Sequence, residues 1–228
     1  MITKPKTLII WDFDGVIADS EHLWVNNWIE CLRTFFALEL SDDMVEYYIR
    51  GKSNKTKVEL LSKGFPEIKL EAPFWDTLKA NTISLINSKL KLTAGVERLF
   101  QNRDFSHCIA TGATKEKNAL KVNKLGLYKY FNNGNMFTAY EVTNGKPAPD
   151  LFLYAAEQMG YLPENCVVIE DSLVGIAAGV AADMPVIAYI GATGNNNDEY
   201  AAKCYQAGAL HIARNMDETA DILHRFYE

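Results

Sequence analysis

Short apolar runs recur along the chain at intervals that suit a parallel β-sheet. Four of them are rich in isoleucine and valine and lack regular alternation, which is typical of strands covered on both faces. They span residues 7–11, 107–111, 166–170 and 185–190, and a weaker run follows at 208–212. Helical patterns lie between them, at 115–127, 148–160 and 172–184, and a further one at 216–228 closes the chain. Strands that alternate with helices predict an α/β fold built on a doubly wound parallel sheet.

The region from residue 17 to about 90 breaks this alternation. It has no convincing strand, and its helical stretches lie at 20–36, 41–49, 54–64 and 72–90. We therefore expect a helical cap domain over residues 17–90, inserted after the first strand, and an α/β core domain with the catalytic site over residues 1–16 and 91–228. The segment 191–200, rich in glycine and asparagine, predicts a surface loop.

Composition excludes several classes of protein. The chain has 228 residues, of which 48% are hydrophobic, enough to bury a full core. Its net charge of −6 argues against a broad nucleic-acid surface, which usually carries a basic excess. No apolar run approaches the length of a membrane span, and the run near the N-terminus ends at Asp12, which does not fit a signal peptide. We expect a cytoplasmic protein with no membrane or nucleic-acid partner, a monomer or a weak homodimer.

The cysteines give the same indication of compartment. Cys31, Cys108, Cys166 and Cys204 lie far apart and form no CxxC pair. Cys108 and Cys166 lie inside apolar runs, which predicts buried thiols in a reducing cytosol, and a zinc site is not expected.

Polar residues follow several of the apolar runs directly, and a lysine lies in a loop before a helix. They are Asp12, Asp14, Thr111, Gly112, Lys146, Glu170 and Asp171. In open α/β sheets the carboxyl ends of the strands form the ligand site, so these residues would converge on one edge. Clustered carboxylates are tolerated beside a divalent cation, and aspartate and carbonyl oxygens suit Mg²⁺. A hydroxyl, an ammonium and backbone N–H groups would cradle a phosphoryl group.

Each of these residues also has a simpler explanation when it is taken alone. Asp12 and Asp14 could cap a helix or form a turn, and Asp171 could be an acid at a helix N-terminus. Lys146 could be a solvated loop lysine, and a threonine such as Thr111 commonly ends a strand. The combination favours a site.

Four segments resemble a known set of motifs. They are "DFDGVIADS", "IATGA", "GKPAPD" and "IEDSLVGIAAG", in that order. They resemble the four motifs of the haloacid dehalogenase superfamily, and the inserted helical region resembles the small cap of its phosphatase-type branch, to which phosphoglycolate phosphatases and β-phosphoglucomutases belong. The resemblance covers essentially the whole chain, and four ordered motifs are far more specific than a lone DxD.

The resemblance implies a role for each motif residue. Asp12 resembles the nucleophile that forms an aspartyl-phosphate, and Asp14 resembles the general acid and base. Thr111 and Gly112 with Lys146 resemble the phosphoryl-binding group, and Lys146 would also hold Asp12 in position. Mg²⁺ would be bound by the Asp12 side chain, the Asp14 carbonyl and Asp171, with Glu170 assisting directly or through water.

The cap and its junction carry less specific signals. The loop 48–57 resembles one that faces the active site in relatives, so Arg50, Lys52 and Ser53 could touch the substrate, or could belong to a solvated helix connection. Asp19 could hold the hinge or simply form a turn. Asp183 stands where relatives usually have glycine, which could alter that turn.

The function that this resemblance implies is a Mg²⁺-dependent phosphatase acting on a small phosphorylated metabolite, such as a sugar phosphate or phosphoglycolate. A β-phosphoglucomutase is the main alternative, although Trp24 stands where its relatives carry a cap histidine. A phosphonatase would need a cap lysine, for which Lys52 is a candidate position. Asp14 argues against a dehalogenase, and the intact motifs argue against a non-enzymatic binding module.

Overall fold

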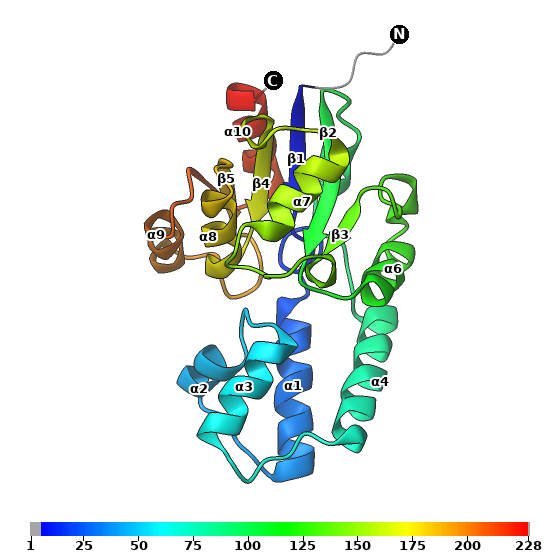
Figure 1. Cartoon of the computed structure of the whole chain (residues 1–228), viewed down its shortest axis with the longest axis vertical. Helices are drawn as coiled ribbons and strands as arrows, with labels where there is room; N and C mark the ends of the chain where they lie inside the picture. Colours follow the sequence, from blue (N-terminus) through cyan, green and yellow to red (C-terminus); the bar gives the residue numbers. More distant parts are fainter. Residues whose placement is uncertain (1–5, 228) are drawn as a thin grey trace. The chain divides into compact units, whose positions relative to one another are not determined.

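The computed structural model describes residues 6–227, and the chain forms two compact units (Figure 1). One unit comprises the described chain up to Asp19 and from Lys91 onward, and the other comprises Ser20–Leu90. The first division therefore comes slightly later in the chain than the expected boundary after residue 16.

A parallel sheet forms the centre of the first unit. In the described residues its strands are β1 (Thr7–Trp11), β2 (Phe105–Thr111), β3 (Met136–Thr138), β4 (Cys166–Glu170), β5 (Val186–Tyr189) and β6 (His211–Ala213). Their order is β3-β2-β1-β4-β5-β6, and every neighbouring pair is parallel. The α/β class with a parallel sheet is thus confirmed.

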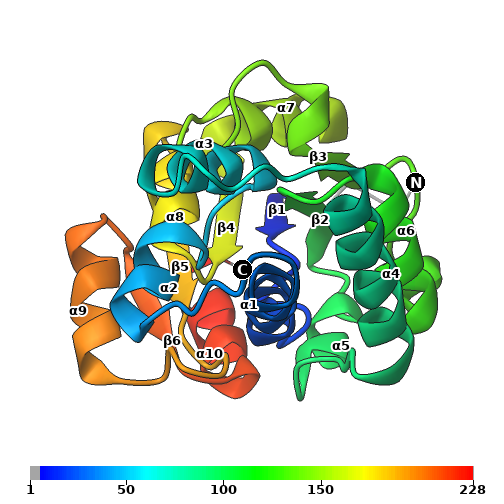
Figure 2. The ribbon, with the colours of Figure 1, turned by 90° about the horizontal axis from the view of Figure 1, so that it is seen from below.

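Helices cover both faces of this sheet, which explains why its strands are apolar without alternation. The helices of this unit are α5 (Val96–Phe100), α6 (Lys115–Lys124), α7 (Asp150–Met159), α8 (Leu173–Ala181), α9 (Asp198–Gln206) and α10 (Met216–Tyr227), with short 3₁₀ turns at Leu127–Lys129, Ala139–Glu141 and Pro163–Asn165. Figure 2 shows α7 and α8 on one face of the sheet and α5 and α10 on the other. Leu8 and Ile10 of β1 enter the core cluster shared with α7 and α8, whereas Trp11 packs edge-on against Phe100 of α5.

Three elements differ from the sequence-based expectation. Strand β3 was not expected, because its three residues carry no apolar run of recognisable length. Helix α9 begins at Asp198, inside the expected loop, and Asn197 caps it by accepting from the Tyr200 N–H. Strand β6 lies later than the expected run at 208–212, because its pairing with β5 begins at His211.

The second unit is helical, with α1 (Glu21–Phe36), α2 (Asp42–Tyr48), α3 (Asn54–Gly64) and α4 (Ala72–Ser88). Its core gathers apolar faces of all four helices around Trp28 and Phe74, whose rings lie 5.4 Å apart. Trp24 is also buried, and Trp75 packs against this core. No helix among residues 6–227 is long and apolar enough to cross a membrane.

Two local expectations can be compared with the structure. All four cysteines are buried free thiols, including Cys108 and Cys166, whose apolar runs predicted their burial. Asp183 has φ 56°, in the left-handed region that glycine adopts most easily and aspartate tolerates. The turn is therefore kept, and Asp183 carries the strain that a glycine would avoid.

Candidate active site

The site begins where β1 ends, at the point where the strand order reverses. Strand β1 lies between β2 and β4, so the residues after Trp11 are flanked by the ends of both neighbours. The Asp12 N–H donates to the Ile169 carbonyl over 2.9 Å, which continues the pairing one residue beyond the strand. Such a switch point opens a crevice at the carboxyl edge of a doubly wound sheet.

Lys146 joins two of the predicted carboxylates. Its ammonium lies 2.6 Å from Asp12 Oδ1 and 2.6 Å from Glu170 Oε1, and it donates to the Ala110 carbonyl over 3.2 Å. The ends of β1, β2 and β4 therefore converge on one lysine from the loop before α7. Only about 10% of the Lys146 side chain is exposed, so this cation is part of a buried network.

Glu170 is fixed on its other oxygen by the start of α8. Glu170 Oε2 accepts from the Ser172 N–H over 2.7 Å and from the Ser172 hydroxyl over 3.0 Å. Gly175 makes this arrangement possible, because a Cβ at that position would overlap the Glu170 carboxylate. Both oxygens of Glu170 are thus engaged, one by Lys146 and one by Ser172.

Asp171 is placed against the turn that carries Asp12 and Asp14. A Cβ at Gly15, which has φ +88°, would overlap the Asp171 carboxylate, so glycine lets the turn approach this side chain closely. Asp171 is 5% exposed, and its carbonyl accepts from the Tyr200 hydroxyl over 2.7 Å. The side chain therefore borders the Asp12–Gly15 turn.

Asp14 has a cationic partner that the sequence analysis did not identify. Lys121 of α6 is fully buried, and its ammonium lies 2.7 Å from Asp14 Oδ2. The only signal in the sequence is that a lysine occupies the apolar stripe of an amphipathic helix, beside Val122. Asp12 and Asp14 are accordingly paired with different lysines.

Thr111 and Gly112 follow β2 at the same edge. Thr111 is 2% exposed and its hydroxyl accepts from the Ala113 N–H over 3.3 Å. Open space surrounds the position of a Cβ at Gly112. Thr114 then caps α6 by accepting from the Lys117 N–H. The end of β2 thus leads directly into a helix N-terminus, where backbone N–H groups favour an anion.

The charges at this edge shift the pKa values of the central pair. Burial raises the pKa of Asp12 to about 7, the charges of Glu170 and Asp14 act in the same direction, and Lys146 opposes them. Burial alone would lower the pKa of Lys146, but its contacts with Asp12 and Glu170 outweigh that effect and raise it. The lysine is therefore held as a cation, whereas burial and the neighbouring acids disfavour the ionised form of Asp12.

The acidic residues fit a divalent cation in the chemistry of their donors. Asp12, Glu170 and Asp171 supply carboxylate oxygens at this edge, and the room left by Gly15 for Asp171 keeps that carboxylate beside the turn. Among residues 6–227, no three His, Cys, Asp or Glu side chains are arranged to hold a metal by themselves. A backbone oxygen or water would therefore have to complete the ligand set, as is usual for Mg²⁺.

The three cap residues proposed from the sequence have local partners within the second unit. Arg50 lies 3.0 Å from Glu46, and the Lys52 ammonium donates to the carbonyls of Glu46 (2.7 Å) and Arg50 (3.1 Å). The Ser53 hydroxyl caps α3 by accepting from the Thr56 N–H. These contacts are those of a helix connection, one of the two explanations left open by the sequence.

Asp19 forms hydrogen bonds with Thr193, which lies in the loop after β5. It accepts from the Thr193 N–H over 3.1 Å and from the Thr193 hydroxyl over 2.5 Å. Asp19 thus ties the last residue of the first segment of the α/β unit to the loop after β5.

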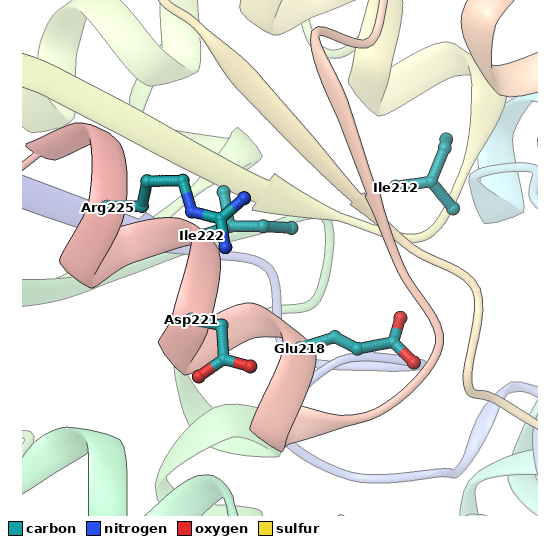
Figure 3. Close-up of a pocket in the computed structure, with 5 residues that line it drawn as sticks. All are labelled: Ile212, Glu218, Asp221, Ile222 and Arg225. Carbon is teal, nitrogen blue, oxygen red and sulfur yellow. The ribbon is translucent and has the colours of Figure 1, made fainter.

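A surface hollow of about 200 Å³ lies elsewhere, between β6 and α10 (Figure 3). It is lined by Ile212, Glu218, Asp221, Ile222 and Arg225. None of these residues is among the carboxylates and lysines at the ends of β1, β2 and β4. The candidate active site is therefore identified by the chemistry of those carboxylates and lysines and not by this hollow.

Comparison with known proteins agrees with this geometry. Residues 6–183 match the family model of haloacid dehalogenase-like hydrolases. The 6-phosphogluconate phosphatase of Escherichia coli is 26% identical over 180 residues, covering 78% of this chain and 80% of that protein. A probable pseudouridine-5'-phosphatase of Drosophila melanogaster is 30% identical over 198 residues, covering 82% of each.

Solved structures show the same fold. A haloacid dehalogenase-like protein from Agrobacterium tumefaciens superposes with a TM-score of 0.80 and 27% identity, covering 97% of this chain and 99% of that one. The family match spans most of the chain and includes β1, β2, β4 and the loop of Lys146. The chain therefore belongs to the haloacid dehalogenase-like hydrolases.

Proposed function

We propose that this enzyme, a phosphoric monoester hydrolase, cleaves the phosphate from a small phosphorylated metabolite such as a sugar phosphate or phosphoglycolate, through an aspartyl-phosphate on Asp12. The observation that carries the proposal is the Asp12–Lys146–Glu170 network at the end of β1, with Lys146 within 2.6 Å of both carboxylates. A phosphatase requires a nucleophile, a cation beside it and a proton donor, and this edge offers all three.

Asp12 is the proposed nucleophile. Lys146 binds Oδ1, which fixes the direction of the carboxylate and leaves the other oxygen, Oδ2, as the atom to attack phosphorus. The alcohol oxygen departs as the Asp12–phosphorus bond forms. Water then attacks phosphorus, the bond to Asp12 breaks, and inorganic phosphate leaves.

Asp14 is the proposed acid and base. In the first step its carboxyl gives a proton to the departing oxygen, and in the second the resulting carboxylate takes a proton from water. Asp14 lies near enough to Asp12 for its charge to raise the Asp12 pKa, so the two groups belong to one site.

Thr111, Gly112 and Lys146 are the proposed phosphoryl-binding groups. The exposed Gly112 and the N-terminus of α6 provide N–H groups beside the Thr111 hydroxyl. Lys146 provides the positive charge for the developing transition state.

Haloacid dehalogenase-like hydrolases generally use Mg²⁺. We propose that Asp12, Asp171 and the Asp14 carbonyl would hold it, with Glu170 assisting directly or through water. When bound, the ion would supply positive charge that reduces repulsion between carboxylate and phosphate. Because both Glu170 oxygens already contact Lys146 and Ser172, the direct contribution of Glu170 would require one of these contacts to open.

The substrate class rests on relatives that span most of this chain. Proteins named 6-phosphogluconate phosphatase and phosphorylated carbohydrates phosphatase cover 78% and 90% of it. Both names describe phosphate esters of aliphatic alcohols. We propose the same class of substrate here.

The test is phosphate release from a panel of sugar, sugar-acid and nucleoside phosphates, with p-nitrophenyl phosphate as a general substrate. Asp12→Asn is expected to abolish release while circular dichroism remains that of the wild type, because an amide cannot replace the nucleophile. Asp104→Asn, the same change at an exposed site, is the matched control. Chelation by EDTA should remove activity and Mg²⁺ should restore it.

Turnover by Asp12→Asn at the wild-type rate would refute the nucleophile, and activity that persists after thorough chelation would refute the metal. Acid-quenched enzyme should carry one phosphoryl group on the peptide that contains Asp12. Conversion of β-glucose 1-phosphate to glucose 6-phosphate without phosphate release would instead identify a mutase.

A further inference from the structure

A buried lysine on α6 contacts the proposed acid–base residue and has no place in the motifs of the family resemblance. Lys121 is 0% exposed, and its ammonium lies 2.7 Å from Asp14 Oδ2 and 4.0 Å from the centre of the Phe13 ring. Burying an ammonium is expensive unless it is paired. Here the pair is made with a carboxylate in the active site.

We propose that Lys121 is a positioning residue for Asp14, which orients the Asp14 carboxyl toward the departing oxygen and thereby adapts the enzyme to phosphate esters of aliphatic alcohols. This inference rests on the proposed function, in which Asp14 transfers the proton. Lys121 itself touches neither phosphate nor metal in this scheme. It acts only through the side chain that it holds.

The surroundings of Asp14 explain why it needs a partner. It lies in the turn after β1, next to Gly15, whose φ of +88° places the turn outside regular structure. A carboxylate on a turn has several rotamers available, whereas Lys121 reaches it from a regular helix. The Phe13 ring, fully buried, lies against the ammonium and restricts its position from a second side.

Asp12 and Asp14 each form an ion pair with a different lysine. Lys146 binds Asp12 and Lys121 binds Asp14, each at 2.7 Å or less. Neighbouring carboxylates could otherwise compete for one cation, and a nucleophile and an acid must not exchange places. Separate cations on separate elements, the loop before α7 and α6, keep the two roles apart.

The leaving group determines how much the reaction rate depends on the position of Asp14. An alkoxide is a poor leaving group and needs the proton of Asp14, whereas p-nitrophenolate leaves readily without it. General acid catalysis contributes about 10²–10⁴-fold where it is needed, and a small misplacement of a catalytic group forfeits much of it. A misplaced Asp14 therefore harms alkyl esters selectively.

The experiment compares kcat/KM for p-nitrophenyl phosphate and for the best alkyl phosphate of the panel. This ratio reports the steps up to departure of the alcohol, so it isolates the acid role of Asp14 from its later role as base. The variants are Lys121→Met, Asp14→Asn and the double variant, with Lys124→Met, an exposed lysine of the same helix, as control.

We expect Lys121→Met to lower kcat/KM for the alkyl phosphate by about 10²-fold and for p-nitrophenyl phosphate by at most a few fold. The double variant should equal Asp14→Asn on the alkyl phosphate, because Lys121 acts only through Asp14. Lys121→Arg should recover part of the activity, and Lys124→Met should match the wild type. The double variant, which removes both charges of the pair, provides a folded comparison if Lys121→Met alone unfolds.

Equal losses on both substrates in Lys121→Met would overturn the inference and make the pair purely structural. Additive losses in the double variant would overturn it as well. Either result leaves the proposed function standing, provided the wild type releases phosphate. Absence of Mg²⁺-dependent phosphate release from wild-type protein would instead refute the proposed function itself.

Discussion

The room that Gly175 leaves for Glu170 gives a direct test of how the site is built. In Gly175→Ala the new methyl group would occupy the space of the Glu170 carboxylate, in the first turn of α8. Glu170 is 1% exposed, so it cannot move into solvent without opening the network. It must turn away from Lys146, from Ser172 or from both.

The size of the effect follows from the contacts at risk. Glu170 accepts from Lys146 at 2.6 Å and from Ser172 at 2.7 and 3.0 Å. Hydrogen bonds to a charged group are each worth about 1.5–3 kcal/mol, and alanine regains about 1 kcal/mol of helix propensity. Loss of two contacts would therefore lower the free energy of unfolding by about 2–5 kcal/mol. Displacement of Lys146 from Asp12 should lower kcat by about 10²-fold.

Gly179 of the same helix supplies the matched control. A Cβ there would lie 2.6 Å from Val186 Cγ2, an apolar neighbour in β5. Gly179→Ala should therefore cost about 1–3 kcal/mol of stability through overpacking. It should leave kcat unchanged in the folded protein, because the new methyl group would meet only the apolar side chains of Val186 and Val168, which have no role in the proposed mechanism.

Urea unfolding measures the stability of each variant, and Mg²⁺-dependent phosphate release measures kcat under conditions where both variants remain folded. The reasoning is refuted if Gly175→Ala keeps wild-type stability and kcat. It is also refuted if Gly179→Ala loses the same activity, because the loss would then reflect α8 packing in general.

Two further predictions concern stability alone. Burial lowers the pKa of His107 from 6.5 to about 4, while its ring accepts from the Trp11 indole N–H over 3.2 Å. Between those two pKa values the unfolded chain binds a proton at His107 that the folded chain does not bind. The free energy of unfolding therefore falls as the pH is lowered through this window. After allowance for the partial exposure of the ring, the decrease is about 1–2 kcal/mol near pH 5. His107→Gln should flatten this acid limb in urea titrations, and an unchanged slope would contradict the assignment. Asp183→Gly should raise the free energy of unfolding by about 0.5–1 kcal/mol, because glycine adopts the left-handed turn without strain, and a decrease would show that the aspartate side chain stabilises the turn.

The sequence by itself determined the class of fold and the residue types at the site. The runs of β1, β2, β4 and β5 were visible because strands covered on both faces must be apolar throughout. The polar residues at the ends of these strands could also be located from the sequence, because an apolar run ends where the chain reaches the edge of the sheet. The order of four motifs then indicated the family.

Edge elements escaped detection because their pattern is set by neighbours. Strand β3 has three residues, and its place depends on pairing with Ile109–Thr111 of β2. Helix α9 starts within a stretch rich in glycine and asparagine, whose composition is that of a loop. In both cases local propensity was weaker than the tertiary contacts that the segment makes.

Only the tertiary structure decided which charges pair. Lys146 was recognised from its loop, but its simultaneous contact with Asp12 and Glu170 depends on β1 and β4 being neighbours. Lys121 lies 107 residues from Asp14 in the chain, and its only local signal is its place in the buried stripe of α6, which does not reveal its partner. Hydrophobic periodicity records what each segment buries, whereas a pairing of charges across the fold exists only once those segments are brought together.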